Sequence, residues 1–354
     1  MPEPKERLSD EVARQEAAAR EAAGEGPLHE MAVGREQVRG REAHAGAIAG
    51  DGVVAEGVPG AGGPVAEVFT ATMTQRQLAW RRFKRHKLAV VCTILLIVIA
   101  LLAIFAPLLT RYSFEEQDLT STLQGPSWSH LFGTDTLGRD QFTRVMYGGR
   151  VSLSVGLAVA FSATVIGTVV GAVAGYYGGK ADNVLMRVTD LFLSIPFLVV
   201  LILGSLLLGG SIFDIVIVLS LFFWMPDARI VRGIFLSLKE KEFVEAARAS
   251  GASDRRIIFN EVLPNALGPI IVSTTLTVAA AILTESVLSF LGYGIQPPTP
   301  TWGNLLDAAK NLAVSAPWLI IFPGVAILIT VLCVNFLGDG LRDALDPQQQ
   351  GAQI

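Results

Sequence analysis

KEKEFVEAARASGASDRRIIFNEVLPNALG, residues 239–268, is a polar stretch between two long apolar segments. Residues 240–250 hold strong helix formers at nearly every position, and apolar or small residues recur there at helical spacing between charged ones. This pattern predicts a short helix with one apolar face. In a chain dominated by apolar segments, this stretch is also the largest surface on which a soluble partner could bind.

The second half of this stretch predicts a bend and another helix. Gly251 follows the first helix at the position where a C-cap needs a left-handed backbone. Ser253 and Asp254 offer an N-cap for a second helix over residues 255–262, and Pro264 is expected to end it because its ring cannot continue the hydrogen-bond ladder. The two helices would form a small knob with apolar and basic surface, which suits a groove on another protein.

The composition indicates a membrane protein. Hydrophobic residues make up 51% of the 354-residue chain, so an all-α membrane protein with several spans is expected. The first apolar segment, residues 88–109, is long enough to cross a hydrocarbon layer of about 30 Å. Pro196 is expected to kink the third span. The six predicted spans are residues 88–109, 151–176, 188–208, 212–235, 269–291 and 318–337.

A basic cluster sets the predicted orientation. It lies directly before the first span, and the positive-inside rule places that end of the span in the cytoplasm. With six spans, both termini are then cytoplasmic. Nucleic-acid binding is the less favoured interpretation of the cluster because of its juxtamembrane position. Its members are Arg81, Arg82, Lys84, Arg85 and Lys87.

The predicted organisation begins with an acidic tail rich in Ala, Gly and Glu, residues 1–75. Disorder is expected there, because the tail carries seven basic and thirteen acidic side chains and too little apolar surface for a core. No signal peptide is visible in it. The remaining predicted parts are a basic flank with the first span (76–110), an extracytoplasmic loop (111–150), a five-helix core (151–338) that contains the polar loop 239–264, and a cytoplasmic tail (339–354).

Three glycines and two acids are notable within the predicted spans. Gly167, Gly171 and Gly175 recur at every fourth position, which predicts a smooth stripe for close helix packing. Asp190 lies near the end of a span, where a solvated or paired carboxylate is favoured over a proton carrier. Glu285, in the outer third of its span, is expected to face protein, water or a basic partner.

No catalytic or metal site is predicted. Cys92 and Cys333 lie in apolar segments and are interpreted as small hydrophobic residues rather than as a disulfide pair or metal ligands. All four histidines lie outside the predicted spans, so the membrane part cannot hold an HExxH zinc site or a Ser-His pair.

Several motifs together resemble one family. Glu245-Ala246-Ala247, followed by Gly251 and Leu263-Pro264, resembles the EAA loop of ABC importer permeases. Three further stretches are similar to signatures of the C-type permease subunit of dipeptide/oligopeptide importers; they are HLFGTDTLGRD (130–140), LSIPF (193–197) and PPTPTWGN (297–304). The resemblance runs from about residue 78 to residue 347. Glu261 departs from the general EAA pattern, which has an apolar residue there.

This resemblance implies a function and partners. It implies a type I ABC importer permease (MetI-like) fold in a bacterial inner membrane, with the EAA loop docked on an ATPase. The implied partners are a homologous B-type permease, two ABC ATPases and an extracytoplasmic peptide-binding protein. ATP and Mg would be bound by the ATPases, since this chain has no Walker motif and is not itself an enzyme. The residues implied in coupling are Glu245, Ala246, Ala247, Gly251, Ala252, Leu263 and Pro264.

Two questions stay open at the level of the sequence. The implied machine could carry dipeptides, longer peptides, glutathione or nickel. A secondary transporter is the alternative from another class, but it would normally need several intramembrane acids or an inverted repeat, and we find only Asp190 and Glu285.

Overall fold

The computed structural model describes residues 75–345, in which helices are the only regular secondary structure. By its contacts the chain divides into residues 1–71 and 72–354, and every described residue belongs to the second unit. The predicted all-α class is confirmed for this part. The predictions for the acidic tail lie outside the described residues, apart from residue 75.

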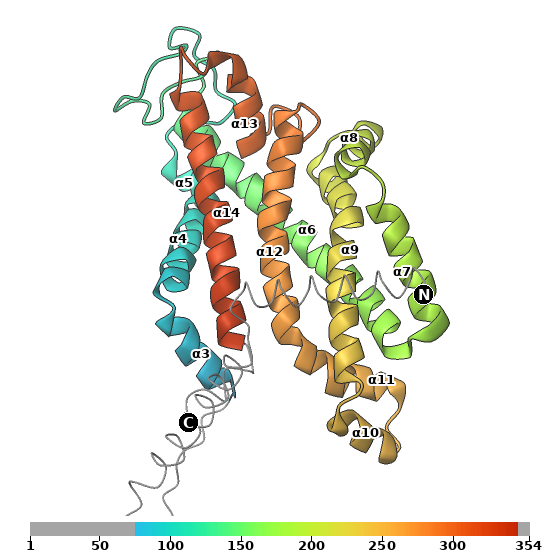
Figure 1. Ribbon diagram of the computed structural model, residues 1–354. Helices are drawn as coiled ribbons and strands as arrows, with labels where there is room; N and C mark the ends of the chain where they lie inside the picture. The colour runs from blue at the N-terminus through green and yellow to red at the C-terminus, as the bar shows by residue number, and fades with distance from the viewer. Residues whose placement is uncertain (1–74, 346–354) are drawn as a thin grey trace, which may run out of the picture. The chain divides into compact units, whose positions relative to one another are not determined.

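Helices of very different lengths make up the described unit (Figure 1). Four of them, α4, α9, α12 and α14, run side by side, and α6 crosses obliquely behind α12 and α9. The elements are α3 (Gln75–Arg85), α4 (Lys87–Ile104), α5 (Ala106–Leu109), α6 (Gln141–Tyr177), α7 (Gly179–Leu193), α8 (Phe197–Leu208), α9 (Ile212–Leu238), α10 (Glu242–Ala249), α11 (Asp254–Arg256), a π-helical turn (Ile257–Val262), α12 (Leu263–Phe290), α13 (Trp302–Ala309), a 3-10 turn (Lys310–Leu312) and α14 (Trp318–Leu345).

The two ends of the bundle differ in character. Helices α3, α10 and α11 lie at one end, and α13 lies at the other end together with the loop between α5 and α6 (Figure 1). The polar stretch that the sequence singles out is therefore at the same end as the basic cluster of α3. This agrees with their predicted common side of the membrane.

Helix α6 is longer than the predicted second span. It begins at Gln141, inside the segment predicted as a loop up to residue 150, because the Asp140 side chain caps it by accepting a hydrogen bond of 2.8 Å from the Thr143 backbone N–H. Its 37 residues correspond to about 55 Å at 1.5 Å per residue, so α6 extends beyond the hydrocarbon layer.

The glycine stripe lies where α6 crosses α9. A Cβ atom added to Gly167 would lie 2.7 Å from the Asp227 Cβ, and one added to Gly171 would lie 2.5 Å from the Ala228 carbonyl oxygen. At Gly175 the added atom would be 2.6 Å from the Phe235 Cβ. All three distances are shorter than a van der Waals contact, so glycine is needed for this approach of the two helices.

The third predicted span is broken rather than gently kinked. Helices α7 and α8 meet at an angle of 84° at Pro196, so the proline does interrupt the span as predicted. Two ion pairs hold α7 against α9. Arg229 binds Asp190, and Arg232 binds both carboxylate oxygens of Asp182, one of them over 2.6 Å.

Four helices of the described part are long and apolar enough to cross a membrane, and the bent pair α7 and α8 makes a fifth candidate. The remaining predicted span, residues 212–235, corresponds to α9, whose 27 residues suffice in length but include Asp214, Asp227, Arg229 and Arg232. The described helices α4 and α14 also differ from the predicted bounds. Helix α4 ends at Ile104 before a short α5, and α14 continues to Leu345, into the predicted tail 339–354.

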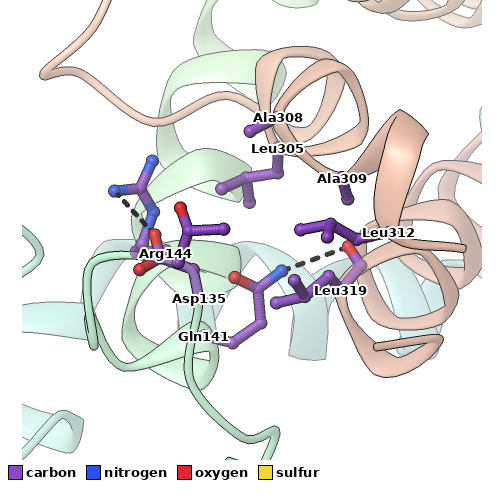
Figure 2. Close-up of a pocket in the computed structure, with 9 residues that line it drawn as sticks. Asp135, Gln141, Arg144, Leu305, Ala308, Ala309, Leu312 and Leu319 are labelled. Atoms are coloured by element: carbon purple, nitrogen blue, oxygen red, sulfur yellow. Dashed lines mark hydrogen bonds and ion pairs between the residues drawn. The ribbon is translucent and has the colours of Figure 1, made fainter. Parts of the chain in front are cut away.

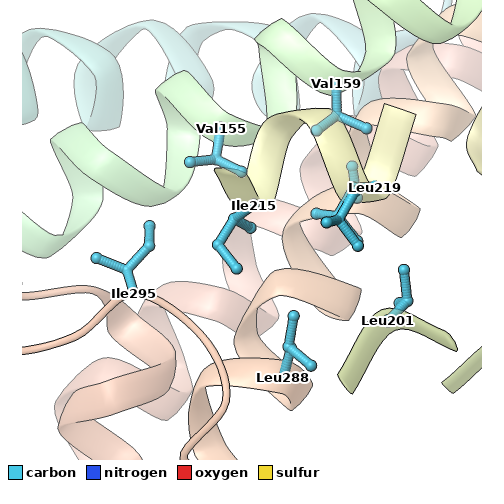
Figure 3. Close-up of a cluster of buried hydrophobic side chains, with 9 residues drawn as sticks. Val155, Val159, Leu201, Ile215, Leu219, Leu288 and Ile295 are labelled. Atoms are coloured by element: carbon cyan, nitrogen blue, oxygen red, sulfur yellow. The ribbon is translucent and has the colours of Figure 1, made fainter. Parts of the chain in front are cut away.

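The main apolar core joins α6, α8, α9 and α12 (Figure 3). Leu201 of α8 and Leu288 of α12 point toward Ile215 and Leu219 of α9, and all four are completely buried. Because lipid tails are as apolar as these side chains, the cluster stabilises a membrane bundle through close van der Waals packing. The buried members are Val155, Val159, Leu201, Ile215, Val218, Leu219, Ala281, Leu288 and Ile295.

Candidate functional site

The polar stretch folds into a compact projection, which we call the knob (residues 239–262). Its first helix, α10, begins after Lys241 and carries Glu242 and Glu245 in its first turn and Arg248 in its last. Acidic residues at the N-terminus and a basic one at the C-terminus both favour the helix dipole. Val244 is the fully buried residue of the helix, so α10 has one face on the protein and the rest in solvent.

Gly251 makes the bend between the two arms of the knob. Its φ is +78°, in the left-handed region, as the sequence predicts. The Gly251 N–H donates to the Arg248 carbonyl over 2.9 Å, and the Ala252 N–H donates to the Ala247 carbonyl over 3.1 Å. These two bonds form a Schellman motif, which satisfies the last carbonyl groups of α10.

The second arm differs from the prediction. Ser253 is the N-cap of α11, although its side chain makes no capping hydrogen bond. Pro264 does not end the helix, and the prediction that it would is wrong. The chain passes from α11 through the π-helical turn Ile257–Val262 directly into α12. A π turn widens the helix, and Pro264 follows in the first turn of α12, where its missing N–H is tolerated.

The knob is anchored to the bundle by apolar and polar contacts. Val244, Ile257 and Val262 are completely buried against Phe235 of α9 and neighbouring residues of α6 and α12. Full burial of each of the three contributes about 1.5–3 kcal/mol. These contacts make the knob a rigid extension of α9, α12 and α6.

A polar contact ties the bend to the end of α6. The Tyr176 hydroxyl donates a hydrogen bond of 2.8 Å to the Asp254 carboxylate. The Arg248 guanidinium lies 5.8 Å from the centre of the Tyr176 ring, within the range of a cation–π contact. One side chain of α6 therefore contacts both arms of the knob.

The outward surface of the knob combines charge with two aromatic rings. Phe259 is 57% exposed and Phe243 38% exposed, so both rings are accessible to a partner. An open pocket of about 390 Å³ lies beside Phe259. The residues that line it are Ser253, Arg255, Arg256, Phe259 and Asn260.

The residues that the sequence singles out for coupling occupy two kinds of position. Glu245, Ala246, Gly251 and Pro264 are exposed. The other three are half-buried in the apolar anchor of the knob; they are Ala247, Ala252 and Leu263. Five of these residues lie on the knob, and Leu263 and Pro264 follow it directly at the start of α12.

The predicted intramembrane acids are both held by protein groups. Asp190 pairs with Arg229 on α9. Glu285 is completely buried and accepts hydrogen bonds from Ser289 over 2.7 Å and from Ser152 of α6 over 3.2 Å. The Ser152 hydroxyl also accepts the backbone N–H of Trp302 over 3.3 Å. Glu285 therefore links α6, α12 and the start of α13.

Sequence reasoning missed a third acid, Asp227. It lies on α9 next to Pro226, is 3% exposed, and accepts a hydrogen bond of 2.5 Å from Ser273 of α12 and one of 3.4 Å from Thr164 of α6. The sequence signal that could have identified Asp227 is a carboxylate within a run of apolar residues.

The opposite end of the bundle contains a polar network around the start of α6. His130 Nδ1 lies 2.9 Å from an Asp140 oxygen, and Asp135 binds Arg139 over 2.7 Å. A cavity of about 20 Å³ lies beside Arg144 and Gln141. Figure 2 shows the side chains that line it, among them Gln141, which donates to the Leu319 carbonyl. A volume of that size accommodates about one water molecule, so this cavity is not a substrate pathway.

Comparison with known proteins places the chain in a family. The model of the "Binding-protein-dependent transport system inner membrane component" family matches residues 167–350. The dipeptide transport system permease protein DppC of Alkalihalophilus pseudofirmus is 44% identical over 287 residues, which cover 81% of this chain and 94% of that protein. The chain belongs to the binding-protein-dependent ABC transport permeases. It is an integral membrane protein of the inner membrane.

A second family match covers the N-terminal part of this permease, and further relatives match most of it. The model of the "N-terminal TM domain of oligopeptide transport permease C" matches residues 74–126. The oligopeptide transport system permease protein OppC of Escherichia coli K12 is 46% identical over 276 residues, 77% of this chain and 91% of that protein. The glutathione transport system permease protein GsiD of Shigella dysenteriae is 42% identical over 273 residues, 77% of this chain and 90% of that protein. Among solved structures, a MetNI methionine ABC transporter chain aligns with 56% of this chain at 22% identity and a TM-score of 0.48.

A substitution at Gly251 tests the bend of the permease's knob. Nothing lies within 4 Å of an added Cβ, so only the backbone conformation opposes a side chain there. Gly251→Val should therefore distort the bend, at a cost of at least about 1–2 kcal/mol, whereas Gly251→Asn should be tolerated because asparagine adopts left-handed φ values. Amide hydrogen exchange of residues 242–262 measures the difference. Equal protection in both variants would contradict this account of the bend.

Proposed function

We propose that this permease forms half of the transmembrane pathway of an ATP-driven importer and transmits the movements of an ATPase through its knob. The observation that carries the proposal is the knob itself. It projects from the end of the bundle, presents Phe243, Phe259 and basic side chains, and is fixed through buried residues to three long helices. A force on such a projection is passed on to α9, α12 and α6 instead of being absorbed by a flexible loop.

The proposed cargo is a peptide. The similarity to dipeptide and oligopeptide permeases extends over more than three quarters of this chain, at 44% and 46% identity. A glutathione permease is 42% identical to this chain, and glutathione is itself a short peptide. Nickel remains a competing cargo of the same machine.

The proposal includes partners that complete the machine. These are a homologous B-type permease for the other half of the pathway, two ABC ATPases that bind ATP and Mg, and an extracytoplasmic peptide-binding protein. This chain would then contribute no catalytic residue. Its own part is to open and close half of the pathway.

Reconstitution tests the proposed function. The permease is incorporated into proteoliposomes with the second permease and the ATPases, and the binding protein is supplied outside with labelled dipeptide, pentapeptide, glutathione or Ni²⁺. We expect uptake of a peptide that needs ATP and persists when the proton gradient is collapsed. Uptake that follows the proton gradient without ATP would support a secondary transporter instead, and uptake of Ni²⁺ alone would refute the peptide cargo.

Charge reversal at Glu245 tests the proposed docking. Glu245 is exposed and makes no ion pair with any residue of the described part, so its carboxylate is available to a basic group of the ATPase. Glu245→Arg should place like charges together and weaken ATPase binding about tenfold or more. The measurement is the affinity of the permease for the ATPase, together with substrate-stimulated ATP hydrolysis.

Glu242→Arg is the matched control for that variant. It reverses a charge in the same first turn of α10 and loses the same favourable contact with the helix dipole, but Glu242 lies outside the EAA motif. If both variants lose affinity equally, the effect belongs to the helix and not to Glu245. Unchanged affinity in Glu245→Arg would contradict the proposed contact.

A further inference from the structure

Helix α3 is attached to the bundle by one side only. Phe83 is almost completely buried and packs with Ala89 of α4 and Ala344 of α14. Gly340 leaves room for this contact, because a Cβ atom there would lie 2.3 Å from the Ala89 Cβ and 3.4 Å from the Phe83 ring. The helix is therefore held in a fixed position at the point where α4 begins.

The rest of α3 presents an aromatic ring among cations. Trp80 is 60% exposed, its ring stacks on Phe83 with a centroid distance of 6.1 Å, and Lys84 Nζ lies 5.0 Å from its centre. Arg85 of α3 and Lys87, the first residue of α4, are also exposed. The sequence has no acidic residue between positions 75 and 114, so nothing within this segment offsets its charge.

Helix α3 directly precedes a candidate membrane span, so these residues are expected at the level of the lipid headgroups. Only His86 separates α3 from α4, a candidate membrane span whose first residue is Lys87. The His86 ring caps α4 by accepting the Ala89 N–H over 3.1 Å, which fixes the corner between the two helices. Tryptophan is enriched at the boundary between water and membrane, and Lys and Arg next to a span are attracted to anionic lipids.

We propose that the exposed residues at the junction of α3 and α4, namely Trp80, Lys84 and Arg85 of α3 and Lys87 of α4, bind the headgroups of anionic phospholipids. The cations would contact the lipid phosphates, and the indole would lie between headgroups and acyl chains. The acidic segment 1–74 is the competing occupant on charge alone. The lipid accounts in addition for the exposed indole and for the place of α3 directly at the start of a span.

The test uses the fluorescence of the full-length permease in mixed micelles. Bromine atoms on lipid acyl chains quench a nearby tryptophan, and the difference between wild type and Trp80→Phe isolates the signal of Trp80. We expect brominated phosphatidylglycerol to quench that signal at a mole fraction at least about fivefold lower than brominated phosphatidylcholine. We also expect 0.5 M salt to reduce this preference, because salt screens exposed charges.

Two sets of variants make the test specific. Lys84→Gln, Arg85→Gln and Lys87→Gln together should strongly reduce the preference for phosphatidylglycerol. Arg111→Gln with Lys310→Gln, exposed basic residues that follow α5 and α13, should leave it unchanged. Equal quenching by both lipids in the wild type would overturn the proposal. So would a preference that emerges only after deletion of residues 1–74, since the acidic segment would then be the occupant.

Discussion

Gly171→Val is expected to prevent stable folding of the permease, because α6 could no longer approach α9. An added Cβ atom would lie 2.5 Å from the Ala228 carbonyl oxygen and 2.7 Å from the Val231 Cβ. Overpacking a well-packed core typically costs about 1–3 kcal/mol. Here the added atom would clash with the backbone of α9, so the whole of α9 would have to move to relieve the clash. We expect a loss of at least about 3 kcal/mol in the free energy of unfolding.

The matched control for this variant is Gly233→Val on α9. Gly233 is exposed and has nothing within 4 Å of an added Cβ, although it carries the same penalty for a β-branched residue in a helix. The measurement is the thermal unfolding midpoint in detergent, with the fraction of monodisperse protein after solubilisation. Equal midpoints for the two valine variants would show that the close contact of α6 with α9 does not stabilise the fold.

The glycine stripe also shows which part of the helix packing could be predicted from the sequence and which part could not. Recurrence at every fourth position predicts that Gly167, Gly171 and Gly175 lie on one face of a helix, since this follows from helical geometry alone. The pattern does not identify the helix that packs there. That choice depends on contacts between segments distant in the sequence, and the structure assigns it to α9.

The knob likewise has one feature that neighbouring residues determine and one that depends on contacts with distant parts of the chain. The bend at Gly251 was predictable, because a helix end that needs φ above zero selects glycine locally. The continuation through Pro264 was not. The π turn that admits the proline is held by Ile257 and Val262, which are buried against helices from elsewhere in the chain. A rule based only on the residues next to the proline therefore cannot predict that the helix continues through it.

Glu285→Ala is expected to release α13 from the bundle. The carboxylate is completely buried and accepts hydrogen bonds from Ser289 and from Ser152, which in turn accepts the backbone N–H of Trp302 at the start of α13. Its removal would leave two buried hydroxyl groups without this acceptor and would open a cavity between three helices. An unsatisfied buried polar group costs about 1–3 kcal/mol, so a total loss of roughly 3–5 kcal/mol is expected.

Glu285→Gln separates the hydrogen bonds from the charge. Glutamine has the same shape; its carbonyl oxygen can accept from one serine, and its amide can donate to the other hydroxyl. This variant should retain most of the stability, and hydrogen exchange of residues 302–309 should stay close to that of the wild type. In Glu285→Ala the same amides should exchange at least tenfold faster, because α13 loses its link to α6 and α12. If the alanine variant protects α13 as well as the glutamine variant does, α13 is held by the packing of Trp302 and not through Glu285.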